Sequence, residues 1–227
     1  MKEFKGVASS RGIAIGPVFQ FQRAELKIET CQNQDPFTEW ARLESAVETA
    51  RAQLVQVYEK ALSETDEEQA EIFQFHLLMT EDADLLDRVK KALEDQRTNV
   101  EPIFMAVSQD YADYLSKMDN EYFAARSVDV LDVANRIERI LMGIAESPTA
   151  GLKVPSIIVA DDLTPSDTIL LDKSLVLGFC TAQGSATSHA AILARGLGLA
   201  AVGGAGSEIL TLANGTNLIL DGGKGVV

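Results

Sequence analysis

His189 is the residue whose type and surroundings point most directly to chemistry. It follows a stretch rich in glycine and hydroxyl groups, residues 184–188 (GSATS), and it precedes small, helix-forming residues, 190–195 (AAILAR). Thr187 or Ser188 is suited to cap a helix, so we expect His189 in the first helical turn. The unpaired amides and positive dipole end there disfavour an imidazolium and favour a neutral, nucleophilic ring. The same amides bind anions, so the position suits a histidine that accepts a phosphoryl group.

Other catalytic patterns are weaker. Residues 196–201 (GLGLAA) fit G-x-G-x-x-A, but they follow a predicted helix and precede a strand, the reverse of a dinucleotide-binding fingerprint. The sequence has no Walker A or protein-kinase motif and no G-x-S-x-G of a serine hydrolase. Cys31 and Cys180 lie far apart and fit no zinc-ligand spacing, which favours unpaired thiols in a reducing cytoplasm.

Residue composition and the spacing of apolar residues differ between the ends and the middle of the chain, which indicates two structural parts. Residues 6–19 are rich in glycine and β-branched residues, which is typical of short strands with turns. From Asp35 and Pro36 onward, apolar residues recur in steps of three and four as far as Ala61, and this spacing predicts one long amphipathic helix. Further helices are expected over residues 66–96 with a break at 80–82, over 101–117 and over 121–143. Helices joined by short polar turns favour a bundle.

After Pro148 the helical spacing of apolar residues ends, and short apolar runs typical of strands return. Buried strands are expected over residues 154–160, 175–181 and 217–220, with a short helix over 188–197. This mixture predicts an α/β arrangement. The simplest architecture is an α/β subdomain built from residues 1–30 and 145–227, with an all-α helical-bundle subdomain, residues 33–143, inserted into it.

The negative charge is concentrated in the middle of the chain. Residues 35–146 hold 25 of the 34 acidic residues and 11 of the 20 basic ones. Such a field repels nucleic acid and anionic lipid and attracts a basic partner; the alternative interpretation is a solvated surface that only keeps the protein soluble. Without a long apolar run or a signal peptide, a cytoplasmic location is expected and no membrane association.

Several stretches resemble enzyme I of the bacterial sugar phosphotransferase system, the phosphoenolpyruvate–protein phosphotransferase family. These stretches are residues 12–16 (GIAIG), 75–79 (FHLLM), 119–132 (DNEYFAARSVDVLD), 161–168 (DDLTPSDT) and 184–195 (GSATSHAAILAR). In that family, phosphoenolpyruvate phosphorylates an active-site histidine, which passes the group to a histidine of the small carrier protein HPr. The resemblance also implies a phosphohistidine α/β subdomain with an inserted helical subdomain.

The resemblance assigns roles to four residues near the site. His189 would be the phosphorylated nucleophile, and Thr168 would hydrogen-bond and orient its ring. Thr187 and Arg195 would support the site. The family usually has a second glycine at the position of Ser185, so the backbone of this loop is expected to have slightly less conformational freedom.

The resemblance places the docking surface for HPr on the helical subdomain. The implied contact residues are Glu67, Glu68, Glu71, His76, Leu78, Met79, Asp82, Asp84, Leu85, Phe123, Arg126 and Leu131. Between residues 59 and 87 there are ten carboxylates and a single lysine, and a carrier with a basic rim would complement such a surface. His76 is expected to be an interface or structural residue rather than a catalyst.

A complete enzyme I continues into a helix and a barrel domain that binds phosphoenolpyruvate and Mg²⁺ and mediates dimerisation. This chain therefore resembles an isolated N-terminal half, expected to be monomeric, to bind no cofactor itself and to exchange phosphate reversibly with HPr. One alternative is the swivelling phosphohistidine domain of a pyruvate phosphate dikinase or phosphoenolpyruvate synthase, which typically has cysteine at the position of Ser188. Others are a nitrogen-regulatory paralogue and a non-catalytic acidic adaptor whose His189 is inert.

Overall fold

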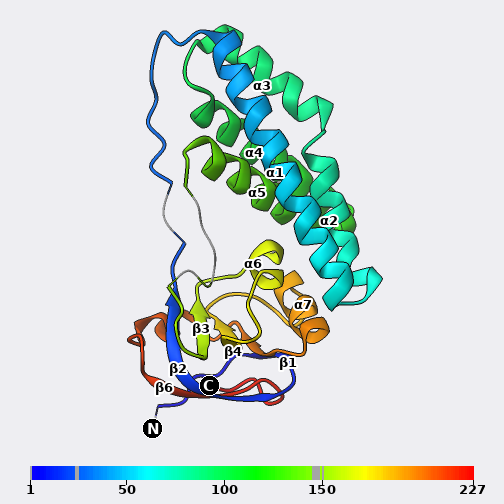
Figure 1. Cartoon of the computed structure of the whole chain (residues 1–227). Helices are drawn as coiled ribbons and strands as arrows, with labels where there is room; N and C mark the ends of the chain where they lie inside the picture. Colours follow the sequence, from blue (N-terminus) through cyan, green and yellow to red (C-terminus); the bar gives the residue numbers. More distant parts are fainter. Residues whose placement is uncertain (1, 24–25, 145–148, 150) are drawn as a thin grey trace. The chain divides into compact units, whose positions relative to one another are not determined.

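The structure, a computed structural model, describes residues 2–23, 26–144, 149 and 151–227, without the side chains of residues 121–125 (Figure 1). The chain divides into two compact units. The α/β unit comprises Met1–Ala24, Lys60–Ala70 and Glu146–Val227, and the helical unit comprises Glu25–Glu59 and Glu71–Ala145. The expected combination of an α/β part with a helical bundle is confirmed.

The middle of the chain forms five helices, in agreement with the periodicity of its apolar residues. They are α1 (Pro36–Glu64), α2 (Glu67–Met79), α3 (Ala83–Gln96), α4 (Val100–Ser116) and α5 (Glu121–Leu141). Side-chain caps fix two of the starts. The Asp35 carboxylate accepts a hydrogen bond from the Thr38 amide at 3.1 Å, and the Asp82 carboxylate accepts one from the Leu85 amide at 3.0 Å. The expected break at residues 80–82 separates α2 from α3.

Apolar side chains from these helices form one buried core. Its members include Leu43 and Leu54 of α1, Leu93 of α3 and Phe104 of α4. Trp40, the single tryptophan of the sequence, packs against this core. None of the described helices is both long and apolar enough to span a membrane.

The α/β unit is built on a six-stranded mixed sheet. Its strands are β1 (Val7–Ser10), β2 (Ile13–Phe21), β3 (Ser156–Ala160), β4 (Val176–Thr181), β5 (Ala200–Gly203) and β6 (Asn217–Asp221), in the order β1-β5-β4-β3-β2-β6. The strands β2, β3, β4 and β5 run parallel to one another, whereas β1 and β6 pair antiparallel with β5 and β2. Every residue of β3 is buried, as expected for a central strand of a parallel sheet.

Among the described residues, two α-helices and a 3₁₀-helix lie between the strands of this unit. They are α6 (Pro165–Ile169), α7 (His189–Leu197) and the 3₁₀-helix η1 (Ser207–Thr211). Because β3, β4 and β5 are parallel, the loops after their carboxyl ends lie at the same edge of the sheet. The loop after β4 leads directly into α7, so the fold places the predicted nucleophile at this edge.

Candidate functional site

His189 is the first residue of α7, as the sequence predicts. Of the two expected caps, Ser188 is the one used: it has extended backbone angles (φ −63°, ψ 152°), and its side chain accepts a hydrogen bond from the Ala191 amide at 3.3 Å. The His189 side chain is half-buried. The ring is therefore fixed to a helix start and still reachable from solvent.

Backbone hydrogen bonds hold the loop before His189. The Gln183 carbonyl accepts hydrogen bonds from the Gly204 amide at 2.9 Å and from the Thr181 hydroxyl at 2.6 Å. The next residue, Gly184, has φ +104°, a conformation that residues with a side chain rarely adopt. The left-handed position is thus Gly184 and not Ser185, so serine at 185 needs no unusual backbone conformation.

The loop and the start of α7 offer several unused amides. Within the described part of the chain, the N–H groups of Gly184, Ser185, Ala186 and Ala190 make no hydrogen bond. The Thr187 amide donates to the Ser185 hydroxyl at 3.3 Å, and the exposed Thr187 hydroxyl lies 3.2 Å from the same oxygen. Amides without internal partners next to a helix start are the groups that bind phosphate oxygens in proteins.

Arg195 fastens this loop to the sheet. Its Nη1 atom donates to the carbonyl of Ser9 in β1 at 2.7 Å and to the carbonyl of Ala186 at 3.0 Å. The guanidinium therefore ties the residue three positions before His189 to the end of β1. In this structure Arg195 holds the backbone of the loop that precedes His189.

We expect Arg195→Met to lower the rate of phosphoryl transfer through His189 by about 10- to 100-fold, because small displacements of a reacting group are costly. The Michaelis constant for the phosphoryl donor should change little. Rapid-quench kinetics measures both quantities. The matched control is Arg11→Met, because Arg11 is exposed and makes no hydrogen bond or ion pair within the described residues. Equal rates for the two variants would contradict the role given to Arg195.

Thr168 lies on α6, a helix that packs against α7. Its side chain is 0% exposed, and its hydroxyl donates to the Thr164 carbonyl at 2.9 Å. With its proton engaged, the hydroxyl can act toward an imidazole only as an acceptor from a ring N–H. This limits the orienting role expected for Thr168 to that direction.

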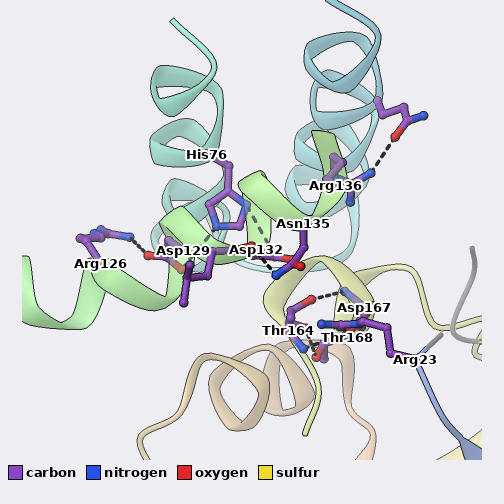
Figure 2. Close-up of polar contacts among 12 residues, drawn as sticks. Arg23, His76, Arg126, Asp129, Asp132, Asn135, Arg136, Thr164, Asp167 and Thr168 are labelled. Carbon is purple, nitrogen blue, oxygen red and sulfur yellow. Dashed lines mark hydrogen bonds and ion pairs between the residues drawn. The ribbon is translucent and has the colours of Figure 1, made fainter. Parts of the chain in front are cut away.

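A capping box fixes α6. The Thr164 hydroxyl accepts from the Asp167 amide, and the Asp167 carboxylate accepts from the Thr164 amide at 3.0 Å. Arg23, just beyond β2, forms an ion pair with Asp167 (Figure 2). This helix is not among the elements predicted from the sequence, although threonine followed by Pro165 and an acidic residue at the third position is a helix-start pattern.

Burial shifts the pKa values of two further groups at this edge of the sheet. Burial raises the pKa of Asp162, which follows β3. Burial also raises the pKa of the Cys180 thiol in β4 to about 12. Cys180 is therefore a protonated, unreactive thiol at neutral pH, and it does not compete with His189 as a nucleophile.

The residues expected at the docking surface divide by exposure. Glu67, Glu68, Glu71 and Leu78 of α2 and Asp84 of α3 are exposed, with Leu78 at 64%. Asp82, Arg126 and Leu131 are half-buried. The side chain of Phe123 lies outside the described residues.

Three residues expected to contact a partner are instead buried. His76, Met79 and Leu85 point into the helical unit, and His76 is 0% exposed. For Met79 and Leu85 this corrects the expectation that they contact a partner at the surface, and for His76 it favours the structural of the two expected roles. Met79 and Leu85 directly follow the exposed residues Leu78 and Asp84, and the three- to four-residue repeat of a helix turns all three side chains toward the core.

Comparison with known proteins identifies the family. The family model "PEP-utilising enzyme, N-terminal" matches residues 5–126, and "PEP-utilising enzyme, mobile domain" matches residues 152–225, PEP being phosphoenolpyruvate. Two phosphoenolpyruvate-protein phosphotransferases are 36% identical to this chain, that of Priestia megaterium over 226 residues and that of Bacillus subtilis (strain 168) over 227 residues. Those alignments cover 100% of this chain but 39% and 40% of the relatives, so the chain spans about two-fifths of their length.

Two solved structures have the same fold. The "NMR solution structure of Enzyme I (nEIt) protein" superposes with a TM-score of 0.80 at 35% identity, covering 99% of this chain and 92% of that chain. The "N-terminal domain of Enzyme 1 - Nitrogen" superposes with a TM-score of 0.67 at 22% identity, a similarity of fold. The resemblance inferred from the sequence motifs is confirmed. This chain belongs to the family of PEP-utilising enzymes and corresponds to the N-terminal part of its phosphoenolpyruvate-protein phosphotransferases.

Proposed function

We propose that this chain transfers phosphoryl groups through His189, which takes the group from phosphoenolpyruvate with the help of a C-terminal domain and passes it to HPr of the sugar phosphotransferase system. Alone, the chain exchanges phosphate reversibly with HPr. The observation that carries the proposal is the placement of His189 at the first position of α7, next to loop amides without internal partners. The similarity of the whole length of this chain to phosphoenolpyruvate-protein phosphotransferases supports the same reaction.

The transfer is an in-line displacement at phosphorus. A ring nitrogen of His189 forms a new N–P bond while the N–P bond of the donor histidine breaks, and the donor nitrogen regains its lone pair. The loose transition state asks mainly for positioning and for stabilisation of the phosphoryl oxygens. The amides of residues 184–186 and of Ala190 and the Thr187 hydroxyl are the donors for those oxygens. Thr168, accepting from the ring N–H, fixes the tautomer that leaves the other nitrogen nucleophilic.

The step between two histidines needs no metal in principle. Mg²⁺ belongs to the reaction with phosphoenolpyruvate in the longer enzymes. The described residues of this chain contain no group of histidine, cysteine or acidic side chains arranged to hold a metal ion.

An HPr-like carrier with a basic rim fits the surface of the helical unit. We call this the docking surface and define it by Glu71 and Leu78 of α2, Asp84 of α3 and Arg126 of α5. It carries exposed carboxylates, those of Glu71 and Asp84, together with an exposed leucine, Leu78. Carboxylates at the rim of an apolar contact steer a basic partner and select against acidic ones.

Mixing the chain with phosphorylated HPr tests the function. We expect one acid-labile phosphate on His189, lost again when excess unphosphorylated HPr is added. Labelled phosphoenolpyruvate with Mg²⁺ should not label the chain without the C-terminal domain of a longer relative. If no carrier in a panel of purified HPr-like proteins transfers phosphate to the chain, the non-catalytic adaptor becomes the better description.

A further inference from the structure

A buried histidine lies beneath the docking surface, and the proposed phosphoryl transfer does not use it. His76 of α2 is 0% exposed. Its ring faces α5, where Nε2 lies 3.4 Å from Oδ1 of Asp129 and Nδ1 lies 3.9 Å from Oδ2 of Asp132. The imidazole also packs against the Phe73 ring in a T-shaped arrangement, with the two ring centroids 5.5 Å apart. The imidazole is thus enclosed between two carboxylates and an aromatic ring.

Asp129 connects this histidine to the surface. The aspartate is fully buried, and its second oxygen, Oδ2, accepts a hydrogen bond from Nη1 of Arg126 at 3.1 Å. Figure 2 shows Asp129 between the His76 ring and the Arg126 guanidinium. The guanidinium also lies 4.8 Å from the centroid of the Phe75 ring, a cation–π contact. Arg126 keeps 15% of its side chain exposed.

The arrangement makes the position of Arg126 depend on His76. Removing one partner of a buried carboxylate costs free energy. Without the imidazole, Asp129 would change position, and with it the carboxylate oxygen that accepts the hydrogen bond from Arg126. Apolar packing would fill the same space without this cost, so stability alone does not account for a polar group here.

We propose that His76 is a positioning residue of the docking surface: through Asp129 it holds Arg126 against Phe75, and it thereby sets the affinity for an HPr-like carrier without touching the carrier. The inference rests on the proposed function, because it assumes that this surface binds the carrier. It replaces the expectation that His76 is itself a contact residue with a role that its burial permits.

A double-mutant cycle tests the inference. The dissociation constant for unphosphorylated HPr is measured by calorimetry for the unaltered chain, His76→Gln, Arg126→Met and the double variant. We expect His76→Gln to weaken binding about 3- to 10-fold, and to have no further effect in the Arg126→Met background, because coupled residues are not additive. The rate of transfer at saturating HPr should stay unchanged, since the chemistry is left intact.

Controls separate positioning from general loosening of the helical unit. Ser108→Ala removes another buried polar group of this unit, one whose hydroxyl has no hydrogen-bond partner among the described residues, and should leave binding unchanged. Asp129→Asn should weaken binding as His76→Gln does, and it replaces that variant if His76→Gln does not fold. Independent, additive losses in the cycle, or unchanged binding by His76→Gln, would overturn the inference. If the unaltered chain neither binds HPr nor exchanges phosphate, the proposed function itself falls.

Discussion

Replacing His189 with alanine is expected to abolish phosphoryl transfer, with a loss of at least about a thousandfold, because the nucleophile that forms the N–P bond is removed. The sequence contains one other histidine, His76, and it is 0% exposed, so it offers no substitute. Transfer of labelled phosphate from phosphorylated HPr measures the loss. Binding of unphosphorylated HPr should remain within about twofold, since the substitution leaves the docking surface unchanged.

The control for this experiment is Thr187→Ala, which removes an exposed hydroxyl two residues away. It should retain transfer at a rate reduced by about tenfold, the range of a hydrogen bond to a charged group. Label that persists at a comparable level in His189→Ala would show that another residue carries the phosphate. The assignment of the nucleophile would then be wrong.

The second large effect concerns a buried carboxyl group of the helical unit. Glu138 of α5 is 0% exposed, and neither of its carboxyl oxygens has a hydrogen-bond partner among the described residues. The guanidinium of Arg42, which acts on this carboxyl group, already pairs with Glu39 and Glu101. Burial, together with the charge of Glu101, raises the pKa of Glu138 from 4.5 to about 8, and Arg42 lowers it only in part.

This shift makes stability depend on pH in a definite direction. Between pH 4.5 and about 8 the folded state holds a proton on Glu138 that the unfolded state has lost. The free energy of unfolding therefore falls as pH rises through this window, by up to about 1.4 kcal/mol per pH unit. The Glu138→Gln variant has no proton to lose. At pH 9 it should be more stable than the unaltered chain by roughly 2 to 4 kcal/mol, allowing for partial solvation of the charge.

Urea unfolding at pH 5, 7 and 9 measures the effect. Fluorescence of Trp40 follows the helical unit specifically, because this single tryptophan packs against the core of that unit. Glu48→Gln, an exposed glutamate of α1, serves as the matched control and should reproduce the pH dependence of the unaltered chain. If Glu138→Gln shows that same dependence, Glu138 is not the group that couples protonation to folding.

The helices could be predicted from the sequence because their information is local. Apolar residues in steps of three and four extend without interruption from Phe37 to Ala61, and capping residues such as Asp35 and Asp82 mark the starts of helices. The helix start at His189 was predicted for the same reason. A glycine, hydroxyl residues and small helix formers stand next to one another in the chain, and neighbouring residues are enough to define the turn.

The partners of the strands could not be predicted in this way. Alternation of apolar residues indicates which face of a strand is buried, but not which strand lies beside it. Val18 of β2 pairs with Ile157, and Ile15 of the same strand pairs with Ile219. These pairings join residues that lie far apart in the sequence, so no pattern among neighbouring residues predicts them.

Burial of polar residues was also beyond the sequence. Glu138 follows Ile137 in a helix whose apolar positions were correctly identified, and an acidic residue beside them is ordinarily solvated. It is buried because another helix packs over it. His76 is similar, since its neighbours Phe75 and Leu78 gave no sign that the ring turns inward toward Asp129.

The pairing of β1 and β2 has a consequence for biosynthesis. Val7 of β1 pairs with Gly203, and Ile13 of β2 pairs with Asp221. Both strands are translated before the helices α1 to α5, whereas their neighbours in the sheet are translated after these helices. The helices between them rest on contacts closer in sequence, which form faster. Two strands must therefore wait with unpaired edges while the helices emerge, so the α/β unit that holds His189 is completed only after the helical unit has been translated.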